Sequence, residues 1–221
     1  MRQPTGTDPL PPLMSRGSGH GGAALDTLVR ICRRIGGWSK TVQAQDGRSR
    51  RVVAVIECIL NQNARDPGAA TFPAMSQAVV RLCAAHDVGI VQIPCPEMAY
   101  LGLQRRRPKG ASIREALDTP GGRECCARLA EQLADRLLDY VANGYRVLAV
   151  LGGNAQSPGC AVVAGSAGRL APASGILMQA LELAFAERRL VIPFRGIRDL
   201  DPNLEREDLD WLQARLEDSD P

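Results

Sequence analysis

The run VVAVI at residues 52–56 decides the fold class. Its residues are continuously apolar and mostly β-branched, which is typical of a strand buried on both faces of a parallel sheet. Three similar runs follow, GIVQI at 89–93, RVLAVL at 146–151 and LVIPF at 190–194. Helical spacing of apolar residues predicts a helix in each interval, at about 74–86, 124–142 and 176–188. We therefore expect an α/β fold, a three-layer α/β/α sandwich with a mainly parallel sheet of about four strands.

Composition divides the chain into four segments. Residues 1–24 are rich in Gly, Pro and Ser and are expected to form a disordered leader. Residues 25–50 are expected to hold an N-terminal helix and a linker, and residues 51–198 form the predicted α/β domain. Residues 199–221 are acidic and are expected to form a C-terminal helix or tail.

The composition also limits the class of protein. Hydrophobic residues make up 45% of the chain, and no run approaches the roughly 20 apolar residues that a membrane-spanning helix needs. The N-terminal residues lack the apolar stretch of a secretory signal, so we expect a cytoplasmic protein with no membrane partner. The net charge of +3 argues against a nucleic-acid partner, although the basic run at 104–109 leaves a tRNA backbone open. A homodimer stays open as well.

Three of the seven cysteines follow predicted strands. Cys58 comes just after the first strand, Cys95 after the second, and Cys160 at the end of the glycine-rich loop after the third. Because the carboxyl ends of parallel strands meet at the sheet edge where α/β folds bind ligands, we expect these thiols to converge. Each thiol alone is typical of a buried cysteine without a role, but the three together favour a metal site.

The other four cysteines carry weaker signals. Cys32 and Cys83 lie on the apolar faces of predicted helices, where cysteine behaves as a small hydrophobe. Cys125 and Cys126 open a predicted helix, and we expect only one of the two to face inward. A helix N-terminus can lower a thiol pKa, so a redox role for this pair stays open. A disulfide framework is not expected in the reducing cytosol.

The donor set favours iron–sulfur over zinc. A structural zinc site with three cysteines usually recruits a histidine. The chain has only His20, in the predicted leader, and His86, at a helix end remote from the strand-end loops. A cubane cluster tolerates three protein thiolates and leaves one iron open for a substrate atom. We therefore expect a [4Fe-4S] cluster on the three strand-end cysteines.

Three motifs around these cysteines resemble the 2-thiouracil desulfurase family, iron–sulfur enzymes that remove sulfur from thiolated nucleobases. The motifs stand in the family's order within about residues 51–195, as CILNQNARDPG at 58–68, CPE at 95–97 and SPGC at 157–160. The resemblance implies that Cys58, Cys95 and Cys160 hold the cluster, and that the partner is a small thiolated molecule.

The resemblance also implies roles for two further side chains. Glu97 would be the acid/base residue, and Ser157 would orient substrate or water beside the open iron. That iron would act as a Lewis acid on the substrate's thiocarbonyl sulfur while water attacks the carbon. The plainer alternatives are a solvated acid for Glu97 and a turn cap for Ser157.

Asn63, Arg65 and Arg107 are the candidate substrate contacts. Arg65 and the basic run that contains Arg107 would hold an anionic thiolated substrate. The plainer alternative is that these residues belong to the solvated surface.

The chain departs from the family's pattern at three positions. Glu57 precedes the first ligand where the family usually has a small residue, Pro67 stands where the family has an aspartate, and Gly159 replaces a serine. These departures leave the ligands intact but change the pocket that would recognise a substrate.

Two other functions stay open. The same cluster could run the sulfur in the other direction and thiolate a substrate. Alternatively, the chain is a non-catalytic metal-binding interaction domain whose acidic C-terminal helix docks a partner.

Overall fold

The computed structural model of the protein describes residues 46–218. The predicted leader and most of the predicted helix-and-linker segment lie outside this range. The chain divides into a unit that ends at Gly47 and one that begins at Arg48, and the second of these carries the fold described below.

The centre of the fold is a parallel sheet. In the described residues it has four strands, β1 (Arg51–Ile56), β2 (Gly89–Ile93), β3 (Arg146–Gly152) and β4 (Phe194–Gly196). They lie in the order β2-β1-β3-β4, and every neighbouring pair is parallel. The predicted α/β fold with a parallel sheet is confirmed. Because β1 is flanked by β2 on one side and β3 on the other, the edge at its carboxyl end is a topological switch point.

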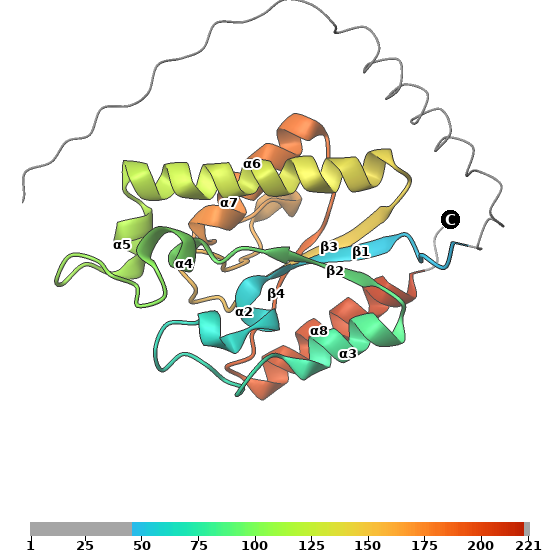
Figure 1. Cartoon of the computed structure of the whole chain (residues 1–221), viewed down its shortest axis with the longest axis horizontal. Helices are drawn as coiled ribbons and strands as arrows, with labels where there is room; N and C mark the ends of the chain where they lie inside the picture. Colours follow the sequence, from blue (N-terminus) through green and yellow to red (C-terminus); the bar gives the residue numbers. More distant parts are fainter. Residues whose placement is uncertain (1–45, 219–221) are drawn as a thin grey trace, which may run out of the picture. The chain divides into compact units, whose positions relative to one another are not determined.

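Helices cover both faces of the sheet, as Figure 1 shows. One face carries α3 (Gln77–Ala85) and α8 (Pro202–Glu217), which pack on each other. The other face carries α6 (Pro120–Ala142) and α7 (Ile176–Arg188), which form the largest helix–helix contact. None of the described helices is long and apolar enough to cross a membrane.

The core is centred on β1. Its residues from Val53 to Ile56 are fully buried, as expected for a strand covered on both faces. Cys125 and Cys126, of which only one was expected to face inward, are both buried. That expectation is wrong because α6 is enclosed on more than one side, by α7 and β3 and by two short helices near its N-terminus.

The predicted fourth strand is also wrong in position. Of the apolar run at residues 190–194 only Phe194 belongs to β4, which continues to Gly196. Val191 is 97% exposed, and pairing with β3 begins only where Val150 N–H donates to the Pro193 carbonyl at 2.9 Å. Proline itself has no N–H to donate to a sheet, so the run before it does not pair as a strand.

Short helices replace the loops expected after β1 and β2. The helix α2 (Glu57–Leu60) follows β1 directly, and the 3-10 turn η1 (Gln62–Ala64) follows it. The long loop expected after β2 contains α4 (Pro96–Leu101) and α5 (Ile113–Leu117). Pro96 occupies the first turn of α4, and Ser112 with Glu115 forms a capping box that starts α5. Two of the candidate ligands, Cys58 and Cys95, therefore stand at helix starts, whereas Cys160 lies in a turn.

Candidate functional site

The three predicted ligand cysteines line one pocket. Cys58, Cys95 and Cys160 follow β1, β2 and β3, and all three are buried. The pocket has a volume of about 250 Å³ and lies at the switch-point edge of the sheet. The three cysteines are far apart in the sequence, and the fold brings them to one pocket, as the sequence predicted.

Glycine and a carboxylate fix the positions of these cysteines. Glu57 Oε2 accepts a hydrogen bond from Cys95 N–H at 2.8 Å, which ties the start of α2 to the start of α4. Gly153 N–H donates to the Cys160 carbonyl at 2.9 Å, and a Cβ at Gly153 would lie 2.8 Å from Cys160 Sγ. Only glycine leaves room for the sulfur there.

Gly159 has a similar packing role. A Cβ at this position would lie 2.5 Å from Pro96 Cγ and 3.3 Å from Glu97 Cγ. The loop that carries Cys160 therefore packs directly on the first turn of α4. This close approach requires glycine at position 159.

Glu97 and Ser157, the predicted catalytic pair, are in contact. The Ser157 hydroxyl donates to Glu97 Oε1 at 3.3 Å. Its oxygen also lies 3.1 Å from Cys160 Sγ and accepts the Cys160 N–H at 3.3 Å. Glu97 is buried, with 8% of its surface exposed. One hydroxyl thus links a buried carboxylate to a candidate ligand.

Arg105 belongs to the site, although the sequence placed it in a solvated basic run. It is 2% exposed, and its guanidinium donates to Glu97 Oε2 at 3.3 Å and to Cys95 Sγ at 3.6 Å. Nothing in the local sequence separates it from Arg106 and Arg107, which are exposed.

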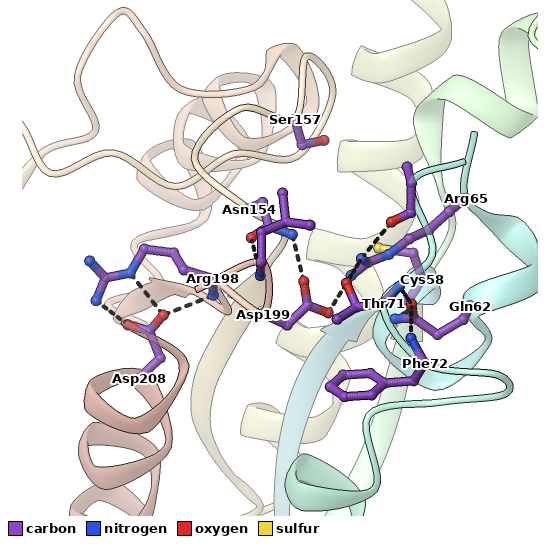
Figure 2. Close-up of polar contacts among 12 residues, drawn as sticks. Cys58, Gln62, Arg65, Thr71, Phe72, Asn154, Ser157, Arg198, Asp199 and Asp208 are labelled. Carbon is purple, nitrogen blue, oxygen red and sulfur yellow. Dashed lines mark hydrogen bonds and ion pairs between the residues drawn. The ribbon is translucent and has the colours of Figure 1, made fainter. Parts of the chain in front are cut away.

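A second buried arginine network flanks Cys58, and Figure 2 shows it. Arg65 Nη2 donates to Asp199 Oδ2 at 2.5 Å, and Asn154 Nδ2 donates to Asp199 Oδ1 at 2.6 Å. Arg65 Nη1 also donates to the Thr71 hydroxyl at 3.1 Å. The sequence predicted Arg65 as a pocket residue but gave no sign of Asp199, which follows β4 in a loop without a motif.

The thiols are in different protonation environments. The Cys160 thiol donates to Cys58 sulfur, and this hydrogen bond, helped by the Arg65 guanidinium, lowers the pKa of Cys58. The same hydrogen bond and complete burial raise the pKa of Cys160. Burial raises the pKa of Cys95 to about 11. The site therefore stabilises the thiolate form more at Cys58 than at Cys95 or Cys160.

Two predicted substrate contacts lie outside the pocket lining. Asn63 is exposed, and its amide donates to Asn61 Oδ1 at 3.0 Å. Arg107 is exposed and donates to the carbonyls of Ala111 and Arg105, both at 2.9 Å. The pocket is instead completed by side chains that the sequence did not single out as contacts, Asp66, Ile113, Asn154, Gln156 and Leu200.

Comparison with known proteins gives one relative without an assigned activity. The chain is 31% identical over 103 residues to an uncharacterized protein of Methanocaldococcus jannaschii, a match that covers 47% of this chain and 64% of that protein. The match thus spans less than two thirds of the relative's length. No family model matches the chain, and no solved structure matches it.

Proposed function

We propose that the protein is a [4Fe-4S]-dependent desulfurase that removes sulfur from a thiolated nucleobase or a related thioamide. One observation carries the proposal: the thiols of Cys58, Cys95 and Cys160 line the same pocket as the hydrogen-bonded pair Glu97 and Ser157. Three thiolates, an acid/base group and a hydroxyl are the set of groups that this chemistry needs.

The donor set suits a cluster better than a single ion. In residues 46–218 no three His, Cys, Asp or Glu side chains converge as a single-ion site. Cysteine sulfurs around a cubane stand roughly 6–7 Å apart because each binds a different iron, so they line a cavity and do not meet at a point. Cys58 and Cys160 are within hydrogen-bond reach of each other, so their side chains must separate on loading. Arg105 donates to Cys95 Sγ at 3.6 Å, and the Arg65 guanidinium lowers the pKa of Cys58, so each favours the thiolate form of the cysteine beside it.

A cluster held by Cys58, Cys95 and Cys160 would supply an open iron, which would act as a Lewis acid toward a thiocarbonyl group. Side chains of the protein then accept and position the proton of the attacking water. The Glu97 carboxylate accepts a proton from the water that attacks the carbon, and Ser157 keeps that carboxylate turned toward Cys160. The net change replaces C=S by C=O, consumes one water, releases hydrogen sulfide and transfers no electrons.

The charges of the pocket favour an uncharged substrate. Both arginines in its lining are already paired, Arg65 with Asp199 at 2.5 Å and Arg105 with Glu97 at 3.3 Å. A phosphorylated or carboxylated substrate would need a cation that is not committed to a protein carboxylate. A free thiolated base therefore suits the pocket better than a nucleotide.

Two polar side chains of the pocket are available to form hydrogen bonds with such a base. In the described part of the chain, Asp66 and Gln156 line the pocket and their side chains have no hydrogen-bond partner. A carboxylate accepts from a ring N–H beside the thiocarbonyl, and a primary amide can both donate and accept. Ile113 and Leu200 provide apolar surface for the ring.

Sulfide release tests the proposal. Protein purified and reconstituted without oxygen should release sulfide from 2-thiouracil, and Glu97→Gln should abolish the release while retaining the iron. Glu124→Gln is the matched control, because Glu124 is exposed on α6 and outside the pocket lining. The proposal is wrong if iron-loaded protein releases no sulfide from any thiolated base.

A further inference from the structure

The geometry points to Arg105 as a positioning residue that clamps the ligand Cys95 and the acid/base residue Glu97 to each other through a single buried guanidinium. The inference rests on the proposed function for the roles of these two partners. The clamp itself is a property of the chain alone, and it predicts results that need no substrate.

Every donor of Arg105 is used. A guanidinium carries five N–H groups in a fixed plane. Nε donates to Glu97 Oε2, and Nη2 donates to Cys95 Sγ and to the Ala64 carbonyl. Nη1 donates to the carbonyls of Gly102 and Leu103 at 3.1 and 3.2 Å. The side chain therefore joins the 3-10 turn η1, the start of α4 and the turn after α4 at one point.

The backbone at Arg105 supports a specific role. Its φ of 48° lies in the left-handed region, which side chains other than glycine rarely adopt. With 2% of its surface exposed, the residue also has almost no contact with water. A strained backbone and a buried cation persist only where the surrounding contacts require that side chain. Here these contacts are the carboxylate, the sulfur and three carbonyls.

The geometry separates Arg105 from a substrate-binding cation. Its two functional contacts are to protein groups, Glu97 at 3.3 Å and Cys95 at 3.6 Å, and no donor is left for a ligand. Partners of this kind orient metal ligands and tune the metal's electronic properties. A positive charge beside a ligand sulfur favours the more reduced, more negative state of a cluster, so it raises the reduction potential.

Lysine cannot replace this clamp. Its ammonium is a point charge with three donors, and it cannot span the carboxylate and the sulfur in one plane as a guanidinium does. Arg105→Lys therefore separates the effect of charge from the effect of geometry, and Arg105→Gln removes both. Arg106→Gln is the matched control, because Arg106 is in the same loop but exposed and outside the pocket lining.

The first measurement uses cluster-free protein. Because Cys95 is buried, its alkylation needs local opening, and we expect easier opening without the clamp to outweigh the smaller thiolate fraction that follows from losing the Arg105 charge. The rate, followed by mass spectrometry, should therefore be about tenfold faster in Arg105→Gln than in wild type, and intermediate in Arg105→Lys. Arg106→Gln should react as wild type does. Thermal unfolding of each variant shows whether the fold is retained, and Arg105→Lys keeps the test informative if Arg105→Gln does not fold. Equal rates in all folded variants overturn the clamp.

The second measurement uses loaded protein. The reduction potential, followed by electron paramagnetic resonance, should fall in Arg105→Gln and change less in Arg105→Lys. For a substrate that is desulfurised, kcat should fall by about a hundredfold in Arg105→Gln with little change in KM, because a misplaced carboxylate slows chemistry more than binding. A rise in KM alone would make Arg105 a substrate contact and overturn the inference. If wild type loads iron but releases no sulfide, the proposed function fails while the alkylation and the potential still decide the clamp.

Discussion

Glu57 Oε2 accepts the backbone N–H of Cys95 at 2.8 Å, so the carboxylate that follows β1 holds the ligand that follows β2. The resemblance to the 2-thiouracil desulfurase family made Glu57 a departure from the expected small residue. In the structure it links the end of β1 to the end of β2. A carboxylate beside the candidate ligand Cys58 looks unfavourable in the sequence, but in the fold it holds the backbone of Cys95.

Removing this link should loosen the site. Glu57→Ala leaves the Cys95 N–H without its acceptor and should lower the free energy of unfolding by about 1.5–3 kcal/mol, the range for a hydrogen bond to a charged group. Iron retention in the loaded protein should fall in parallel. Glu57→Gln keeps an acceptor oxygen and should lose less. Chemical denaturation and iron analysis check both results, and equal stability of Glu57→Ala and wild type would contradict the role.

The buried ion pair beside Cys58 predicts a second stability effect. Asp199→Asn leaves the largely buried Arg65 guanidinium without its counter-charge and should destabilise the fold by about 3 kcal/mol or more. Asp210→Asn, on the exposed side of α8, should change stability by less than about 0.5 kcal/mol. Urea denaturation of the two variants measures the difference. Similar midpoints would show that Arg65 does not depend on Asp199.

The tight packing at Gly159 predicts the effect of a serine at this position. Gly159→Ser places a Cβ 2.5 Å from Pro96 Cγ, so α4 or the Cys160 loop must move. We expect a loss of about 1–3 kcal/mol in stability and weaker iron retention. Gly47→Ser is the control, because no atom lies within 4 Å of a Cβ built there. A Gly159→Ser protein as stable and as rich in iron as wild type would contradict the close packing.

Iron loading should depend on pH with a defined sign. A thiol must lose its proton to bind iron, and burial raises the pKa of Cys95 to about 11 while Cys160 is also raised. The fraction of thiolate at these two positions therefore grows as pH rises toward those values. Iron affinity should increase from neutral to mildly alkaline pH, with protons released on binding. Reconstitution at several pH values measures it, and an affinity that falls over this range would exclude these thiols as ligands.

Substrate reading by Asp66 can be tested with modified bases. Asp66→Asn replaces an acceptor by a group that can donate, so KM for 2-thiouracil should rise by about tenfold, the cost of one lost charged hydrogen bond. N-methylated 2-thiouracils, which lack a ring N–H, should be poorer substrates of wild type and less affected by the substitution. Asp87→Asn, outside the pocket lining, is the control. Unchanged KM in Asp66→Asn would remove Asp66 from the substrate contacts.

The parallel sheet and the position of the three cysteines at one of its edges could be predicted from the sequence. Continuous apolar runs mark buried strands, and parallel strands place their carboxyl ends at one edge. The apolar run at residues 190–194 was wrongly predicted to be a strand, because an apolar stretch that contains Pro193 need not pair with a neighbouring strand. Short helices such as α4 and α5 carry too few residues to show a period, although the Ser112–Glu115 capping box was visible in the sequence.

The rest of the site depends on tertiary contacts that no local pattern encodes. Arg105 is buried and Arg107 exposed, although both belong to the same basic run. Arg105 is buried because the fold places it against Glu97 and Cys95. Asp199 reaches Arg65 across 134 positions of sequence. Such pairings become visible only once the strands have brought their loops together.

The iron content of protein purified without oxygen tests the central claim most directly. The account predicts about four iron atoms and a matching amount of acid-labile sulfide per chain, with the spectrum of a cubane cluster. Separate Cys58→Ser, Cys95→Ser and Cys160→Ser variants should each lose most of this iron, whereas Cys83→Ser should keep it. Wild-type protein that binds no iron under reconstitution, or that keeps its iron in all three ligand variants, would contradict it.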